Sequence, residues 1–341
     1  MNNCEHTYCN PAFSHLYIEE KAAEYAVTKM VLSKFSHAQH IQIRHYKDVF
    51  CRGHQNFFLQ KKSPSLILAK RDTPCLYEGA KPCQDFGFSH FYYISSVMNC
   101  VYDCEYCYLQ GMYPSANLVV FVNLQEEFRQ VEQQLKRHPV YLCISFDTDL
   151  LALEPLLGYV RRWIAFTREH KDLTVEIRTK SANYRHIADI PPLDRVILAW
   201  SLSPQEIVQR YEHKTASLQA RLDNVALAAQ DGWKIRLCFD PIIYQKNWEA
   251  AYGQLIQQTF QVVPAQRILD VSVGTFRVAK DALKRMRKSR MDSALLQYPY
   301  TLCGGVYQYE QKIGQTMLEK MCAGLEQFLP ADKIFEWQEE T

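Results

Sequence analysis

The sequence lacks the features of a membrane protein or a secreted protein. It has no run of about 18 uninterrupted apolar residues, so we expect no membrane-spanning helix and no membrane partner. Residues 1–6 do not combine a basic start with an apolar stretch, so no signal peptide is predicted. The 12 cysteines therefore indicate reduced thiols and metal ligands rather than a disulfide framework, and the cytoplasm is the expected location.

Strong net charge and internal repetition are also missing. The 341 residues carry a formal net charge of +2, so contact with nucleic acid requires a local basic patch. No repeat and no low-complexity linker divides the chain, which predicts one compact unit. With 48% hydrophobic residues, a chain of this length can bury a sizeable core.

Three cysteines with C-x3-C-x2-C spacing are the most informative feature: Cys100, Cys104 and Cys107. Four cysteine ligands suit simple electron transfer, whereas three leave one iron of a [4Fe-4S] cubane without a protein ligand. The spacing, with Tyr106 just before the last cysteine, is typical of radical S-adenosylmethionine (SAM) enzymes. In that family SAM binds the open iron and is cleaved to a 5′-deoxyadenosyl radical, which abstracts hydrogen from a substrate.

A buried helix stripe and a zinc site are the alternatives to a cluster. Cysteines at i, i+4 and i+7 can form such a stripe, but Asn99, Asp103 and Glu105 are interleaved with them. A zinc site needs a fourth ligand, usually from a second C-x2-C or an H-x3-5-H pair, and none follows. No recognised ligand spacing or H-E-x-x-H motif involves the remaining candidates: Cys4, Cys9, Cys51, Cys75, Cys83, His6 and His15.

Strand and helix patterns alternate between residues 89 and 276. Strands are predicted over residues 91–97, 140–146, 173–179, 196–202, 234–242 and 269–275. Helical patterns cover residues 124–137, 154–170, 215–231 and 248–260, with a short turn at 183–188. Repeated βα units predict an α/β fold with a parallel sheet, and six units fit a partial TIM-like (β/α)6 radical SAM barrel. Working residues lie at the C-terminal ends of barrel strands, and the three cysteines follow the first strand.

The barrel is expected to carry an extension at each end. Residues 1–88, with a helix pattern at 19–34 and strand-like pieces at 41–46 and 66–69, are predicted to pack on the barrel. Residues 89–276 form the barrel itself. Residues 277–341 are predicted to hold a basic stretch, an aromatic-rich turn and a helix at 312–328.

The chain resembles the spore photoproduct lyase family, radical SAM enzymes that repair the DNA thymine lesion 5-thyminyl-5,6-dihydrothymine. The cluster loop with its YCYLQ run at 106–110 is the specific part of the resemblance. Supporting segments are spread along the chain: residues 16–19, 123–127, 179–180, 200–202, 241–244, 248–249 and 304–305.

The resemblance implies which residues would bind SAM. Tyr106 would lie against the adenine, and Thr148, Lys180 and Ser201 would hydrogen-bond the ribose or carboxylate from neighbouring strand ends. A cationic lysine suits a carboxylate, and hydroxyls at strand ends suit a ribose. The ordinary alternatives are a solvated charge for Lys180 and a satisfied barrel hydroxyl for Ser201.

The chain departs from the family at the residue that returns hydrogen to the repaired thymine. Family members carry a cysteine there, in a run like S-C-x-S-D, whereas this chain has Phe146 in the run 145–149. Phenylalanine has no labile hydrogen. Cys143 and Tyr108 are candidate substitutes, but strand alternation predicts that Cys143 and Phe146 point to opposite faces. A buried structural thiol is the alternative for Cys143.

A dense basic run follows the barrel: Arg277, Lys280, Lys284, Arg285, Arg287, Lys288 and Arg290. On a helix, residues 277, 280, 284 and 288 would share one face, which could contact DNA phosphates or be a solvated surface. The segment 294–303, where lyases place a basic hairpin, is instead apolar and aromatic.

The sequence therefore predicts a radical SAM enzyme of the spore photoproduct lyase type, with repair impaired or altered by Phe146. Its cofactors would be a [4Fe-4S] cluster and SAM, and its partners DNA and an electron donor such as flavodoxin or ferredoxin. Two alternatives stay open: a divergent relative that binds nucleic acid without repairing it, and a radical SAM enzyme acting on another substrate.

Overall fold

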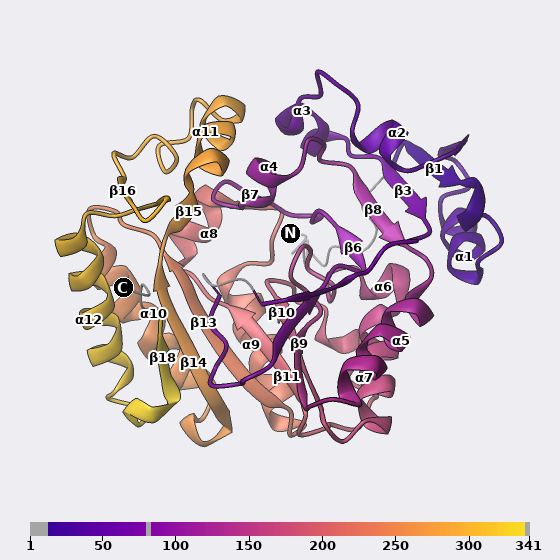
Figure 1. Cartoon of the computed structure of the whole chain (residues 1–341). Coiled ribbons are helices and arrows are strands. Elements are labelled where there is room, and N and C mark those ends of the chain that lie inside the picture. Colours follow the sequence, from indigo (N-terminus) through magenta and orange to yellow (C-terminus); the bar gives the residue numbers. More distant parts are fainter. Residues whose placement is uncertain (1–12, 80–82, 338–341) are drawn as a thin grey trace, which may run out of the picture.

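A computed structural model describes residues 13–79 and 83–337. Its centre is an eight-stranded sheet (Figure 1). The order is β18 (Ile334–Glu336), β14 (Ile268–Thr275), β13 (Lys234–Ile242), β11 (Val196–Ser201), β10 (Leu173–Thr179), β9 (Val140–Cys143), β5 (Phe91–Ile94) and β4 (Leu76–Glu78). All neighbouring pairs are parallel except β4 with β5. The predicted partial (β/α)6 barrel is confirmed by the six consecutive parallel strands from β5 to β14.

Helices cover the outer face of these strands, as parallel sheets require. The helices between the barrel strands and after them are α5 (Leu124–Leu135), α6 (Glu154–Leu157), α7 (Tyr159–Glu169), α8 (Gln205–Tyr211), α9 (Leu218–Gln230), α10 (Trp248–Val262) and α12 (Gln311–Leu325). The helix expected over 154–170 is interrupted because Gly158 adopts a left-handed φ of 64°. Among the described residues, no helix has the length and apolar character needed to span a bilayer.

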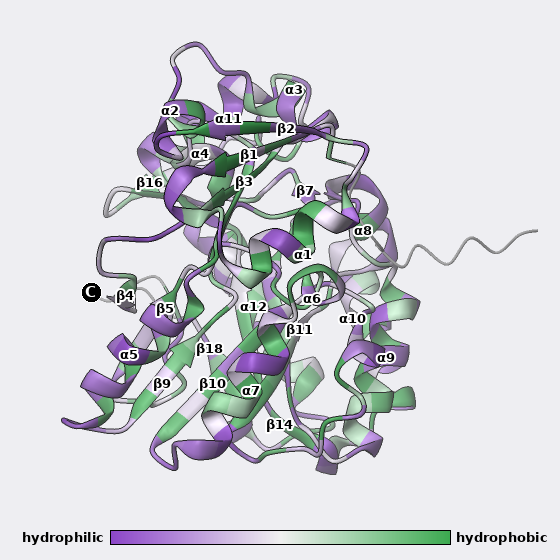
Figure 2. Cartoon of the chain, turned by 90° about the vertical axis from the view of Figure 1, so that its right-hand side faces the viewer, coloured by the Kyte–Doolittle hydropathy of each residue, from purple (hydrophilic) through white to green (hydrophobic). Residues whose placement is uncertain are grey.

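A second sheet lies beside the barrel, at the end where the site is found (Figure 2). Its order is β2 (Gln39–Ile43), β1 (His15–Glu19), β3 (Leu66–Ala69), β8 (Leu118–Phe121) and β6 (Val97–Met98). Helices α1 (Ala26–Lys34), α2 (Lys47–Phe50) and α3 (Phe57–Lys62) belong to this region. The helix expected over 19–34 begins only at Ala26, since Glu19 is the last residue of β1 and Glu20–Ala22 form a separate 3-10 helix.

The N-terminal sheet includes strands that follow residue 88. β6 pairs with β8, and β8 pairs with β3 of the N-terminal segment. The strand expected over 91–97 is consequently divided between the two sheets. Residues 91–94 join the barrel and residues 97–98 join the N-terminal sheet. The boundary at residue 88 stays a prediction.

Buried charged side chains pair with one another inside the barrel. Arg236 on β13 is fully buried and donates to Glu176 on β10 at 2.5 Å and to Asp270 on β14 at 2.7 Å. Tyr141 on β9 also donates to Glu176 at 2.5 Å. Burial would raise the pKa of Glu176, but Arg178 and Arg236 lower it to about 2. These residues lie in the first half or at the middle of their strands, before the C-terminal ends.

Candidate active site

The cluster loop, residues 99–108, connects β6 to α4 (Leu109–Met112). Asn99 begins it in a left-handed conformation, with φ of 69°. The buried Asn99 side chain donates to the backbone oxygens of Ser115 at 2.7 Å and Asn117 at 2.8 Å. These bonds fix where the chain leaves the strand and enters the loop.

A short antiparallel ladder holds the centre of the cluster loop. β7 (Asp103–Cys104) pairs with β12 (Glu212–His213), which follows α8. The Glu105 amide donates to the backbone oxygen of Tyr211 at 2.8 Å. The Glu105 carboxylate in turn lies 2.8 Å from His213 Nε2. Cys104 is therefore attached to the part of the barrel that follows β11.

The three loop cysteines are free thiols in partly or fully buried positions. Burial raises the pKa of Cys100 to about 11 and also raises that of Cys107, with Lys61 the largest opposing influence on both. Burial likewise raises the pKa of Cys104. Such thiols become thiolates when a metal replaces their protons.

The donor set fits a cubane better than a single ion. In the described part of the chain, no three His, Cys, Asp or Glu side chains converge as ligands of one metal ion. In a cubane each thiolate binds a different iron, so the sulfur atoms need not meet at one point. Three thiols on one anchored loop match that need.

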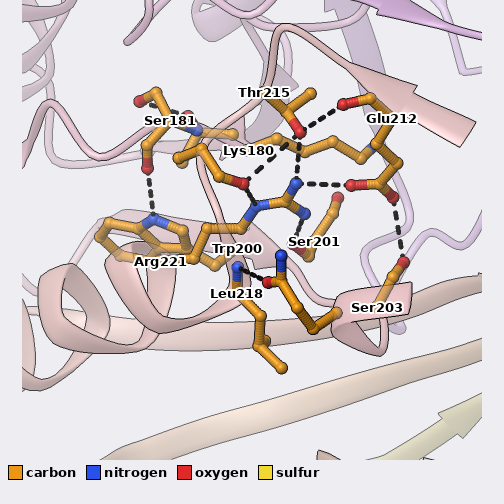
Figure 3. Close-up of polar contacts among 12 residues, drawn as sticks. Lys180, Ser181, Trp200, Ser201, Ser203, Glu212, Thr215, Leu218 and Arg221 are labelled. Atoms are coloured by element: carbon orange, nitrogen blue, oxygen red, sulfur yellow. Dashed lines mark hydrogen bonds and ion pairs between the residues drawn. The ribbon is translucent and has the colours of Figure 1, made fainter. Parts of the chain in front are cut away.

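A buried ion pair supports Tyr106 of the loop. Arg221 on α9 donates to Glu212 at 2.5 Å, and both side chains are fully buried (Figure 3). Tyr106 donates a hydrogen bond to the same carboxylate, and Ser203 donates to it at 3.0 Å. Burial would raise the pKa of Glu212, but Arg221 and Lys180 lower it. The carboxylate thus stays ionised and holds the Tyr106 ring in place.

The predicted SAM-binding side chains lie after three successive barrel strands. Thr148 follows β9, Lys180 follows β10, and Ser201 ends β11. The Lys180 ammonium lies 5.3 Å from the centre of the Tyr106 ring, so these two predicted residues are together. Burial would lower the pKa of Lys180, but Cys104 and Glu212 raise it, so the side chain is a cation.

Among the predicted SAM-binding residues, Thr148 has a side-chain hydroxyl that forms no hydrogen bond with the described residues. Its side chain is 7% exposed, and its hydroxyl has no partner among the described residues. A buried hydroxyl without a partner is costly, so a polar ligand atom would satisfy it. Ser201 is also buried, and its backbone oxygen accepts from Arg221 at 3.0 Å.

Asp149 connects the C-terminal ends of β9 and β10 by hydrogen bonds. Its carboxylate accepts from the Thr179 hydroxyl at 2.8 Å, from the Lys180 amide at 2.6 Å and from the Ala152 amide at 2.9 Å. The backbone that carries Thr148 is therefore fixed to the backbone that carries Lys180. Sequence reasoning missed this residue as a support, although it lies in the quoted run 145–149.

Tyr108 and Phe146 are neighbours at the site. Tyr108 is 37% exposed and donates to the Phe146 backbone oxygen at 2.9 Å and to Asp147 at 3.2 Å. The Phe146 ring stacks on the Tyr93 ring, with centroids 4.0 Å apart. Tyr113 also donates to Asp147, at 2.8 Å. The residue at the family's donor position therefore lies in an aromatic cluster beside Tyr108.

The expectation that Cys143 and Phe146 point to opposite faces is wrong. β9 ends at Cys143, so strand alternation does not continue to residue 146. Cys143 is the register partner of Tyr93, on whose ring Phe146 stacks, so both side chains lie on the Tyr93 side of the sheet. The Cys143 thiol is buried and lies 3.9 Å from the Glu176 carboxylate.

Some residues of the basic run bind other parts of the fold, and others are exposed. Arg285 binds the backbone oxygen of Gly111, and Arg287 donates to the backbone oxygen of Leu296 at 2.7 Å. Arg277 lies on β15 (Arg277–Ala279) and pairs with Asp240 at 2.9 Å, so its expected place on the helix face is wrong. Arg290 binds Asp103 of the cluster loop. The exposed residues of α11 (Lys280–Ser289) that share one face are Lys280, Lys284 and Lys288.

The segment after α11 forms a hairpin. Its strands are β16 (Thr301–Cys303) and β17 (Val306–Gln308), with Gly304 and Gly305 in the left-handed region at the turn. β17 also pairs with β15. The exposed β16 strand carries no basic residue.

The remaining cysteines are scattered. Cys51 is exposed, Cys75 is buried, and Cys83 is partly buried. Cys4, Cys9 and His6 lie outside the described residues.

The sequence analysis did not identify Glu212 and Arg221 as a buried ion pair. Their pairing depends on contacts between α9 and the short β12 strand.

Comparison with known proteins identifies relatives over nearly the whole chain. A family model described as spore photoproduct lyase matches residues 12–337. The spore photoproduct lyase of Bacillus subtilis (strain 168) is 22% identical over 347 residues, which cover 95% of this chain and 98% of that protein. The lyase of Geobacillus sp. (strain Y412MC61) is 22% identical, covering 94% and 96%.

Solved structures of spore photoproduct lyase share the fold. A mutant with bound S-adenosylmethionine and the dinucleoside spore photoproduct superposes with a TM-score of 0.80 at 19% identity, covering 97% of this chain and 100% of that chain. A complex with the dinucleoside spore photoproduct gives 0.81 at 20% identity, covering 96% and 99%.

Proposed function

This chain belongs to the spore photoproduct lyase family of radical SAM enzymes, and from that membership we propose that it acts on a UV thymine lesion in DNA. The observation that carries the proposal is the loop with Cys100, Cys104 and Cys107, which is anchored to β12 and contacts Lys180 just after barrel strand β10. The relatives' names connect this architecture with the lesion.

The loop cysteines would hold the [4Fe-4S] cluster, which supplies one-electron cleavage of SAM to a 5′-deoxyadenosyl radical when both are bound. Three protein ligands leave one iron for SAM. The protein's own task is to hold these thiols and exclude water from them. Asn99, Glu105 and the pairing of β7 with β12 perform the first part of that task.

Four side chains would bind and orient SAM: Tyr106, Thr148, Lys180 and Ser201. The unpartnered Thr148 hydroxyl and the buried Lys180 cation supply polar contacts for a ribose or a carboxylate. Tyr106, fixed by Glu212, supplies a ring surface. For Ser201 the support is its place at the end of β11.

Hydrogen return is the step in which this chain differs from its family. We propose Cys143 and Tyr108 as the groups that replace the missing thiol at position 146. Cys143 lies on the same side of the sheet as Phe146, and the Tyr108 hydroxyl contacts the Phe146 backbone. The Cys143 thiol would give a hydrogen atom to the substrate radical and become a sulfur radical. The Tyr108 hydroxyl would return a hydrogen atom to that sulfur, and the external electron donor would reduce the resulting tyrosyl radical, with a proton from solvent.

DNA would bind along the exposed face of α11, through Lys280, Lys284 and Lys288. Exposed lysines along one helix face suit a phosphate backbone.

The electron for SAM cleavage would come from a small carrier such as flavodoxin or ferredoxin. An oxygen-sensitive cluster also favours the reducing cytoplasm as its location.

Phe146 supports a second candidate function, a relative that binds the lesion without repairing it. The first experiment is anaerobic reconstitution with iron and sulfide counting, followed by detection of 5′-deoxyadenosine. A synthetic spore photoproduct dinucleotide is then incubated with SAM and reductant. Thymine above the no-enzyme control supports repair, and DNA affinity without SAM turnover supports binding alone. SAM turnover without thymine or DNA affinity indicates another substrate.

A further inference from the structure

Lys61 is a buried cation from outside the barrel that reaches the cluster loop. It lies on α3, and the residue is 5% exposed. Its ammonium donates to the backbone oxygen of Cys100 at 2.5 Å and to that of Tyr102 at 2.7 Å. Both acceptors belong to the loop that carries the three cysteines.

Lys61 forms no ion pair with any residue that the structure describes. Within residues 13–79 and 83–337, no carboxylate lies within ion-pair distance of its ammonium. Its two identified acceptors are neutral backbone oxygens. A buried ammonium without a counter-charge is costly, and it favours negative charge nearby.

The position of Lys61 is itself fixed. Its backbone oxygen accepts from Lys214 at 2.5 Å, next to β12. Since β12 pairs with β7, the same ladder that holds Cys104 also holds Lys61. Hydrogen bonds and strand pairing therefore connect Lys61 with the loop that carries the cysteines.

We propose that Lys61 is a positioning residue that fixes the Cys100 end of the cluster loop and, by its charge, stabilises the reduced cluster. This inference rests on the proposed function, since it requires a cluster at Cys100, Cys104 and Cys107. On reduction one electron passes from the external carrier to the cluster. A fixed cation beside a centre that gains negative charge raises its reduction potential.

Three variants separate charge from hydrogen bonding and from general damage. Lys61→Gln keeps an amide donor but removes the charge, and Lys61→Arg keeps the charge. Lys62→Gln is the matched control, because Lys62 is the next residue of α3 and is exposed. All are made in the full chain and reconstituted anaerobically.

The decisive measurement is the midpoint potential of the cluster, followed by electron paramagnetic resonance during a redox titration. We expect a more negative potential in Lys61→Gln, an unchanged potential in Lys62→Gln, and a potential near wild type in Lys61→Arg. Equal potentials in Lys61→Gln and wild type would overturn the proposal.

Loss of the cluster is also informative. If Lys61→Gln fails to hold iron while Lys61→Arg holds it at the wild-type potential, the charge is required and the proposal stands. If both lose their iron, the assignment to charge is overturned. Failure of the proposed function is distinguishable, because the wild-type protein itself would then retain no cluster.

Discussion

Tyr108 donates its hydrogen bond to the backbone oxygen of Phe146, at 2.9 Å, and not to its side chain. The identity of the side chain at position 146 can therefore change without removing this contact. Asp147, the next residue, accepts a second bond from the same hydroxyl at 3.2 Å. The position of the Tyr108 hydroxyl is thus set by the residues after β9. A substitution of the Phe146 side chain therefore tests the missing thiol without changing the Tyr108 contact.

The first prediction is that Phe146→Cys raises repair. A thiol at this position supplies the labile hydrogen that phenylalanine lacks, and the Tyr108 contact is kept. We expect several-fold more thymine per 5′-deoxyadenosine formed from the spore photoproduct dinucleotide. Phe146→Ala is the matched control, since it removes the ring without adding a thiol. A yield in Phe146→Cys no higher than in Phe146→Ala contradicts the prediction.

The second prediction concerns Cys143 as the substitute donor. Cys143→Ala should lower the thymine yield and leave 5′-deoxyadenosine formation unchanged, because only the return of hydrogen is affected. The cost in stability should be about 1 kcal/mol, as for a small buried truncation. Cys238→Ala, which removes another buried thiol from strand β13, is the control. Equal yields in the two variants would remove Cys143 from the reaction.

Elements with a continuous apolar pattern were predictable from the sequence. β10 and β13 have the predicted bounds, and β13 follows Asp231 and Gly232, which end α9. Such strands are buried on both faces, so local composition and tertiary packing favour the same structure. The positions of the cluster loop and the strand-end residues followed from the same pattern.

Features that depend on distant partners were not predictable. Ser95 and Ser96 interrupt the strand expected over 91–97, because Ser95 binds Asp147 and Ser96 binds Glu127. The buried pair of Glu212 with Arg221 likewise forms only when α9 packs beside β12. The local sequence does not predict these partners, because their positions depend on the tertiary fold.

The third prediction tests the lysines of α11. Lys284→Gln combined with Lys288→Gln should weaken DNA binding and make it less dependent on salt. If each lysine neutralises one phosphate, the slope of log affinity against log salt should decrease in magnitude by about 1.8. Lys312→Gln with Lys320→Gln removes the same charge from α12 and is the control. The measurement is a titration at several salt concentrations, and equal slopes for the two double variants argue against this surface.

The fourth prediction is a pH dependence of stability that depends on Glu127 of α5. Burial raises the pKa of this carboxyl from 4.5 to about 7, and the side chain accepts from Ser96 at 2.5 Å. Above pH 4.5 the unfolded chain loses this proton while the folded protein keeps it. The stabilising contribution is therefore fully present below pH 4.5 and is lost as pH rises to about 7.

The size of this effect follows from the shift, which corresponds to about 3 kcal/mol in the free energy of unfolding. Glu127→Gln cannot ionise and keeps an oxygen for the Ser96 hydroxyl, so its stability should fall less between about pH 5 and about pH 7. Denaturant unfolding at several pH values measures the difference between wild type and variant. Glu126→Gln, on the solvent side of the same helix, should follow the wild type. Parallel curves for wild type and Glu127→Gln would show that Glu127 ionises equally in the folded and unfolded states.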